Sequence, residues 1–254
     1  MTDAITISKP RNRDGSTGHV LAKRSVTFTE IRTIPFVSPP GSDFMSTRLP
    51  SAKPLKRPTQ QRAKATVQAI FDTYVRIWQR DGWSRLTTRA VALEAGVAIG
   101  TLYDYFPNKH ALHSGYVRYC VEQLLEAIDA QAVAPTALAW PERIRRLVRA
   151  LAGVEPQLPW FHPDMLELEA LVAEPKHQRR AYEDLLSAWH RVIDAATDLP
   201  VRPSPATLEA LHLSVWGGRR YAMLVQLEAD RMADWANCME HLCLHTLMGA
   251  NEPA

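Results

Sequence analysis

The stretch GVAIGTLYDYFPNKHAL, residues 96–112, places a small-residue turn before a very short run with two tyrosines and a phenylalanine. Upstream, Thr87 or Thr88 can cap a short helix that ends at Gly96. Gly96 can adopt the left-handed conformation that a tight turn requires, and Val91 and Leu102 are candidate contacts between the two short helices. The stretch LTTRAVALEAGVAIGTLYDYF, residues 86–106, therefore has the pattern of a helix-turn-helix.

The chain from Thr59 onward has helical periodicity throughout. Val67, Ile70, Phe71, Tyr74 and Trp78 fall on one face of a helix that Asp81-Gly82 would end. Six further helices are predicted from residues that typically begin or end a helix. These residues are Asn108, Pro141, Gly153, Pro163, Pro200 and Ser204-Pro205. Their expected ranges are 109–130, 141–153, 163–173, 175–198, 205–229 and 231–248.

Residues 1–58 differ from the remainder in composition. Prolines recur among Ser, Thr, Lys and Arg without a sustained apolar period, so we expect this basic extension to be disordered. The run TFTEIRTIPFV (27–37) has weak strand character but no partner strand elsewhere in the chain. Met45 opens MSTRLPSAKPLKRP and could be the true first residue of the protein. Residues 1–44 would then result from a misassigned translation start.

Composition indicates a soluble globular protein, with 46% hydrophobic and 22% charged residues in 254. No run of about 18 apolar residues and no apolar signal region is visible, so we expect no membrane partner and a cytoplasmic location. Cys120, Cys238 and Cys243 suit reduced, buried thiols better than a disulfide framework.

Basic and acidic residues are distributed unevenly along the chain, which the net charge of +3 does not show. Residues 46–120 hold 12 Lys and Arg against 4 Asp and Glu, whereas residues 121–254 hold 12 against 19. A basic segment joined to an acidic one indicates that the first meets a polyanion such as nucleic acid and the second does not.

The segment from Arg62 to Leu112, with AGV, GTLY, YF and NK in order, resembles the DNA-binding domain of the tetracycline-repressor (TetR/AcrR) family of bacterial regulators. The resemblance implies an all-α fold in which an N-terminal three-helix helix-turn-helix domain precedes a helical ligand-binding and dimerisation domain. The expected domains are residues 59–119 and 120–250. The implied function is a ligand-responsive repressor that binds a palindromic operator as a homodimer and is released by an unknown small-molecule effector.

Carried over by position, the resemblance assigns DNA contacts to both short helices and to the start of the next one. The candidates are Thr87, Thr88, Arg89, Ile99, Gly100, Thr101, Tyr103, Tyr105 and Lys109. Lys109 matches the family's phosphate-binding lysine, and after the N-cap Asn108 its charge sits unfavourably at the positive end of a helix dipole unless a phosphate lies nearby. Phe106 is the aromatic that more readily belongs to the core.

Two departures from the family pattern concern the second short helix. Ala98 stands where the family commonly has serine, which removes a hydroxyl N-cap that typically stabilises a helix by about 1 kcal/mol. Ile99 occupies an often polar position, and we expect an apolar contact with a thymine methyl group.

The C-terminal half supplies candidates for two further sites. An apolar effector pocket could be lined by Trp160, Phe161, Met165, Tyr182, Trp189 and Trp216, although each of these residues more readily belongs to the structural core. The resemblance implies that the last two helices pair with their copies in a dimer. The candidate seam residues, each of which could instead be buried within one subunit, are Leu211, Val215, Ala222, Met223, Trp235, Met239, Leu242 and Leu247. Arg219 and Arg220 could meet an anionic ligand or form inter-subunit salt bridges.

Other function classes find less support. Cys238, His241 and His245 share a helical face but need a further ligand to hold a metal, so no metal or other cofactor is expected. His162-Pro-Asp164 and the pair Glu167 and Glu169 form no recognisable catalytic motif, so no enzyme is expected. The alternative to the regulator is a helical small-molecule or metal-binding sensor without specific DNA recognition.

Overall fold

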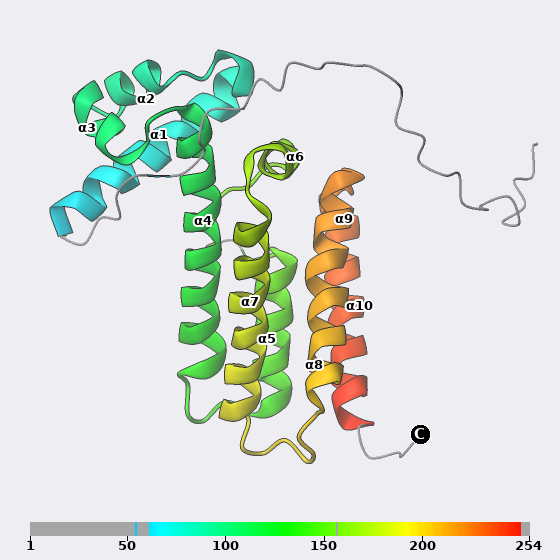
Figure 1. The fold of residues 1–254 in the computed structure, drawn as a ribbon. Helices are drawn as coiled ribbons and strands as arrows, with labels where there is room; N and C mark the ends of the chain where they lie inside the picture. Colours follow the sequence, from blue (N-terminus) through cyan, green and yellow to red (C-terminus); the bar gives the residue numbers. More distant parts are fainter. Residues whose placement is uncertain (1–53, 55–60, 156, 250–254) are drawn as a thin grey trace, which may run out of the picture. The chain divides into compact units, whose positions relative to one another are not determined.

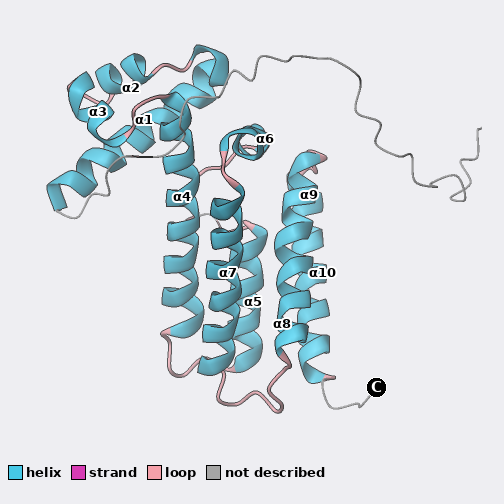
Figure 2. Ribbon diagram, in the orientation of Figure 1, coloured by secondary structure: helices cyan, strands magenta, loops and turns pink. Residues whose placement is uncertain are grey.

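The computed structural model describes residues 54, 61–155 and 157–249, and every regular element within these residues is a helix (Figures 1 and 2). The all-helical fold class predicted from the sequence is therefore confirmed. Apart from Pro54, the expectations about residues 1–58, including a start at Met45, lie outside the described residues.

The N-terminal part contains α1 (Gln61–Arg85), α2 (Thr88–Glu94) and α3 (Ile99–Tyr105), after which α4 (Lys109–Ile128) begins. Gly82 interrupts α1 with φ 73° and ψ 174°, at the place where Asp81-Gly82 was expected to end the helix. Since L side chains rarely adopt this φ, glycine is the residue suited to the break.

A first hydrophobic core joins these four helices. Ile70 and Tyr74 of α1, Val91 of α2, Leu102 of α3 and Leu112 of α4 are fully buried in it. Each buried aliphatic side chain stabilises the fold by about 1.5–3 kcal/mol relative to exposure. The predicted contacts Val91 and Leu102 are thus part of one core that holds α2 and α3 on α1 and α4.

The C-terminal part begins with the second half of α4, which continues into the π-helical turn η2 (Asp129–Val133). Next come α5 (Trp140–Ala152), α6 (Pro163–Val172) and α7 (Pro175–Ala195). Figure 1 shows α4, α7 and α5 side by side, while α6 is seen end-on beyond the end of α7. Pro141 and Gly153 bracket α5 as predicted, and Gly153 is a left-handed C-cap with φ 75°.

The second core lies between these helices and the C-terminal pair. Ile144 and Leu147 of α5, Leu185 and Trp189 of α7 and Cys243 near the C-terminus are among its buried members. The buried guanidinium of Arg143 closes the end of η2 by donating hydrogen bonds to the carbonyl oxygens of Ala132, Val133, Pro135 and Leu138.

Three consecutive segments, α8 (Pro205–His212), η3 (Leu213–Gly217) and α9 (Gly218–Leu224), form one long helix, beside which α10 (Ala229–Met248) runs antiparallel (Figure 1). The Ser204 side chain caps α8 as predicted, by accepting a hydrogen bond from the Thr207 backbone N–H at 3.1 Å. The predicted range 205–229 is wrong at its end, because the chain leaves the helix after Leu224 and Gln226 adopts φ 51°.

Candidate functional site

The helix-turn-helix is built from local caps and one glycine turn. The Thr87 hydroxyl caps α2 by accepting a hydrogen bond from the Ala90 N–H at 3.1 Å. Gly96 has φ 67°, and the Val97 N–H donates to the Ala92 carbonyl at 3.0 Å, which closes the end of α2. Ala98 is the N-cap of α3 and makes no side-chain hydrogen bond, as its missing hydroxyl implies.

The outer face of α3 is exposed. Ile99 is 40% and Tyr103 44% exposed, and a Cβ added to Gly100 would meet open space. The hydroxyls of Tyr103 and Thr88 lie 3.2 Å apart and link α3 to the start of α2, next to the exposed Arg89. These side chains therefore present apolar, hydroxyl and cationic groups on one accessible part of the helix-turn-helix.

The end of the motif is more enclosed. Tyr105 is partly buried against the first core, and Phe106 is buried in it. The Lys109 ammonium lies 4.3 Å from the centre of the Trp83 ring and donates to the Trp83 carbonyl at 3.4 Å. Asn108 caps α4 as predicted, because its side chain accepts from the Ala111 N–H at 2.9 Å.

An ion-pair cluster fixes α2 on α1. Glu94 accepts from Arg76 at 3.3 Å and from Arg80 at 3.1 Å. The hydrogen bond from Arg80 lowers the pKa of Glu94 and raises the pKa of Arg80. The pairs are exposed and therefore screened by solvent, so their main consequence is the relative orientation of α1 and α2.

A buried polar chain runs from α1 through α4 to α6. The Tyr74 hydroxyl and His113 Nδ1 are 2.8 Å apart, and His113 Nε2 lies 3.4 Å from Glu169 Oε2. The Ser114 hydroxyl also donates to Glu169, at 3.2 Å. Burial lowers the pKa of His113 to about 4 and raises the pKa of Glu169 to about 7. The first core is thus connected by polar contacts to a residue in the wall of a cavity.

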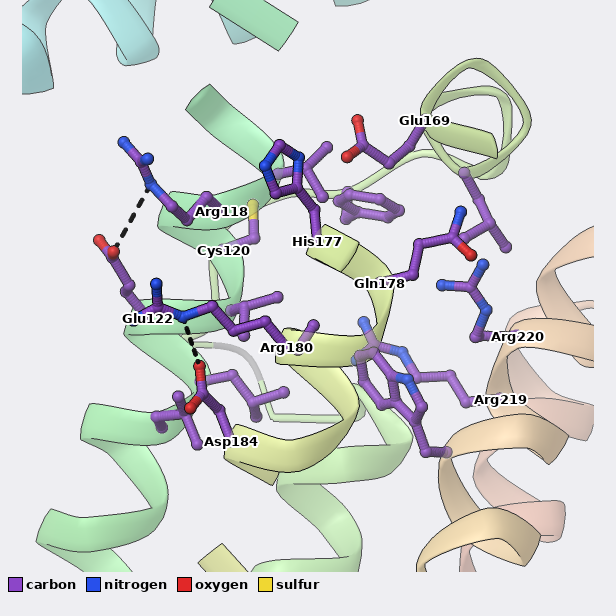
Figure 3. Close-up of a pocket in the computed structure, with 18 of the residues that line it drawn as sticks. Arg118, Cys120, Glu122, Glu169, His177, Gln178, Arg180, Asp184, Arg219 and Arg220 are labelled. Carbon is purple, nitrogen blue, oxygen red and sulfur yellow. Dashed lines mark ion pairs between the residues drawn. The ribbon is translucent and has the colours of Figure 1, made fainter. Parts of the chain in front are cut away.

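That cavity has a volume of about 920 Å³ and is bounded by α4, α6, α7, α9 and the segment before α6 (Figure 3). Phe161 and Trp216, two of the predicted lining residues, line it. The other four lie elsewhere. Met165 and Trp160 belong to the first core, Trp189 is buried in the second, and Tyr182 hydrogen-bonds to Glu209 and packs against His212.

Sequence reasoning missed the polar part of the cavity wall. The labelled side chains of Figure 3 include Arg118, Glu122, Arg180 and Asp184, none of which was predicted to line a pocket. On α4 and α7 these residues have the spacing of an ordinary solvated helix face. Only the placing of Arg219 and Arg220 in an otherwise apolar helix gave a signal.

The predicted dimer residues divide into three groups. Leu211, Val215, Ala222, Met239 and Leu247 are buried inside the subunit. Their place in an inter-subunit seam stays a prediction. Trp235 packs against the core and Met223 lines the cavity, while Leu242 is 50% exposed. Exposed apolar residues that were missed on these helices are Leu213, Tyr221, Leu224 and Met248.

The thiols and candidate metal ligands are dispersed. Cys243 is buried and Cys120 partly buried, but Cys238 is exposed, so its predicted burial is wrong. No group of three or more His, Cys, Asp or Glu in residues 61–155 and 157–249 is arranged to hold a metal ion. None of the helices in the described part of the chain has the length and hydropathy needed to span a membrane.

The family model described as bacterial regulatory proteins of the tetR family matches residues 70–114. These residues run from the first core of α1 through α2 and α3 to the first turns of α4. No curated protein sequence matches the chain.

Solved structures of TetR-family regulators share the fold at low sequence identity. One from Streptomyces coelicolor is 19% identical, with 74% of this chain and 99% of that chain covered and a TM-score of 0.50. Regulators from Haloarcula marismortui (17% identical, 73% and 97% covered) and Thermobifida fusca (15%, 74% and 100%) also have TM-scores of 0.50. The motif match shows that residues 70–114 are a segment of the tetR family of bacterial regulatory proteins, and the solved structures show that the described helices share the fold of such regulators.

Proposed function

We propose that the protein is a repressor that binds a palindromic operator as a homodimer and releases it when a small molecule enters the cavity bounded by α4, α6, α7 and α9. The observation that carries this proposal is the buried chain from Tyr74 through His113 to Glu169, because it connects the core beneath the helix-turn-helix to the cavity wall.

The exposed face of α3 is suited to the DNA major groove. Ile99 offers an apolar surface to a thymine methyl group, and Gly100 lets the DNA backbone approach the start of α3. Thr87, Thr88, Arg89, Thr101, Tyr103 and Tyr105 supply hydroxyl and guanidinium donors for phosphates or base edges. An ammonium has three donors, so Lys109 can keep its bond to Trp83 and still meet a phosphate.

Dimerisation is assigned to the exposed side of the long C-terminal helices. Leu213, Tyr221, Leu224, Leu242 and Met248 are between 49% and 69% exposed. On the long helix formed by α8, η3 and α9, the small exposed residues Ala210, Ser214 and Gly217 lie on one face, at offsets of four and three residues. Their size would let a partner helix approach closely. A second copy is the proposed occupant, since a two-fold dimer presents two α3 helices to the two half-sites of a palindrome.

The cavity and the helix-turn-helix share α4. Its first turns carry Lys109 and His113, and its middle turns carry the cavity residues Ser114, Arg118 and Glu122. A ligand shifts the equilibrium only if it binds one arrangement more tightly than the other. Contacts that move Glu169 or Ser114 would act on His113 and hence on the position of α4 against α1.

Selection of bound sequences from a random duplex pool with the full chain tests the proposal. We expect a palindrome whose half-sites are about one helical turn apart, roughly 34–36 Å. An Arg89→Ala variant should lose the motif, whereas the matched surface variant Arg145→Ala on α5 should keep it. Recovery of no preferred sequence at any salt concentration would contradict the repressor and favour the sensor without specific DNA recognition.

A further inference from the structure

The cavity contains more arginines than its own carboxylates neutralise. Three of them have ion-pair partners: Arg118 pairs with Glu122 at 3.6 Å, Arg180 with Asp184 at 3.6 Å and Arg191 with Asp129 at 2.9 Å. Figure 3 shows the first two pairs on one side of the cavity, while Arg219 and Arg220 extend into it from the opposite side. Among the described residues, neither of these last two arginines forms an ion pair.

Arg219 is held in a place with little water. Its guanidinium donates to the Leu151 carbonyl at 3.3 Å and lies 5.3 Å from the centre of the Trp216 ring. It packs so closely on the backbone of Gly153 that a Cβ there would lie 2.6 Å from the guanidinium carbon. Burial lowers the pKa of Arg219 to about 10, so the side chain stays cationic at neutral pH without a carboxylate partner. A partly buried charge without an ion-pair partner is costly to the fold, and an anion would reduce that cost.

Arg220 continues the same cationic patch towards α6. Burial lowers its pKa, and the nearby carboxyl of Glu169 partly opposes this shift. Glu169 is the one carboxyl of the described cavity wall that has no arginine partner within ion-pair distance. Two arginines face one carboxyl whose charged form is disfavoured by burial, so the patch keeps at least one surplus positive charge, which suits a monoanion.

The remainder of the wall is largely apolar. Val121, Leu125, Leu158, Phe161, Leu166 and Trp216 line it from four separate segments. A volume of about 920 Å³ is in the range of pockets that enclose most of a small organic ligand. The wall therefore suits a molecule with an apolar body and a single charged end.

We infer that the ligand of this cavity is an apolar monocarboxylic acid whose carboxylate is bound by Arg219 and Arg220 and whose hydrocarbon part packs against Phe161 and Trp216. This inference rests on the proposed role of the cavity as the effector site. A planar guanidinium binds carboxylate with two parallel hydrogen bonds, which an alcohol or an amine cannot reproduce. Binding at Arg220 also places the acid beside Glu169, the end of the polar chain that leads to Tyr74.

Calorimetric titration of the DNA-free full chain tests this assignment. The probes are hexanoate, decanoate and tetradecanoate, each compared with the alcohol and the primary amine of the same length. At least one acid should bind about tenfold or more tightly than its alcohol, because hydrogen bonds to charged groups contribute about 1.5–3 kcal/mol. Arg219→Gln and Arg220→Gln should remove this preference, and Arg179→Gln, an exposed arginine of α7 outside the cavity, should retain it.

The preference of the wild-type chain for acid over alcohol is itself decisive, so the test does not depend on a variant that folds poorly. Equal binding of acid and alcohol, tighter binding of the amine, or no binding of any acid would overturn the inference. Operator release is measured separately. If an acid binds and the operator stays bound, the ligand class stands and the release mechanism fails. If another compound releases the operator while no acid binds, the release mechanism stands and the assignment of the ligand as a carboxylic acid fails.

Discussion

His113 Nε2 lies 3.4 Å from Glu169 Oε2, with the histidine fully buried and the glutamate 15% exposed. The contact joins α4 to α6, and the Tyr74 hydroxyl on the other side of the imidazole extends it to α1. Neither charged form is favoured here, since burial lowers the pKa of His113 to about 4 and raises that of Glu169 to about 7. The neighbours of Glu169 are Ser114 and the cation of Arg220, and both lower its pKa against the larger effect of burial.

Glu169 should therefore make stability depend on pH. Its pKa is raised in the folded state, so its favourable contribution is complete below the ordinary value of 4.5 and is lost as pH rises through about 7. Between about pH 5 and pH 8 the wild type should lose about 2–3 kcal/mol of unfolding free energy relative to Glu169→Gln. Urea unfolding of both proteins across this range measures the difference. The exposed Glu167→Gln on the same helix is the control, and parallel curves for wild type and Glu169→Gln would refute the role of burial.

Close packing at Gly115 predicts a second effect. A Cβ at this position would lie 2.5 Å from Cε1 of Phe106, whose ring is itself packed 5.6 Å from Phe71. Gly115→Ala should destabilise the protein by about 1–3 kcal/mol, because the ring has to move within a filled core. Gly100→Ala is the matched control, since its Cβ would meet open space in a helix. Thermal unfolding that leaves the two variants equally stable would contradict this packing.

Most helix boundaries were predictable because their causes are local. Thr87, Asn108 and Ser204 each cap a helix with their own side chain, and Gly153 ends α5 in a conformation that suits glycine. The missing cap at Ala98 was predictable for the same reason. Such features depend on residues within one turn of each other.

The cavity and the exposed apolar side of α8 to α10 were not predictable because they depend on which neighbour a helix face meets. Val215 and Leu242 look alike in an amphipathic pattern, yet one is fully buried in the subunit and the other is half exposed. Trp189 has the size expected of a ligand-binding aromatic but fills the second core. Arg118 and Arg180 look like solvent-facing residues, although the arrangement of α4 and α7 places them in the cavity wall.

Ile99 predicts sequence discrimination at one base pair. It is 40% exposed at the start of α3, where an apolar side chain would contact a thymine methyl group. In the selected operator, replacing the contacted thymine by uracil should weaken wild-type binding but leave Ile99→Ala indifferent. Gel-shift titration with both duplexes measures the ratio of thymine to uracil affinity for the wild type and for Ile99→Ala. Equal loss in wild type and variant would place the methyl contact elsewhere.

Lys109 predicts a change in salt dependence. If its ammonium meets a phosphate, Lys109→Ala should reduce the slope of log K against log salt by about 0.9. The variant also loses the contact with the Trp83 ring, worth about 0.5–1 kcal/mol, so its stability must be measured alongside. Lys176→Ala on α7, whose ammonium pairs with Glu174, should keep the wild-type slope. An unchanged slope for Lys109→Ala would show that the ammonium stays with Trp83 in the complex.

The exposed C-terminal helices predict that dimer formation depends on Tyr221 and Leu242. These side chains are 69% and 50% exposed, so a charge there costs the single subunit little but would be desolvated between two subunits. Tyr221→Glu and Leu242→Glu should give monomers in sedimentation-velocity experiments. Their operator affinity should also fall, because a monomer presents only one α3 helix to the two half-sites. Leu171→Glu on α6, at 73% exposure, is the control and should remain dimeric. If the two helix variants stay dimeric while Val215→Ala dissociates, the buried residues rather than the exposed ones would form the seam, and α8 to α10 would have to rearrange on assembly.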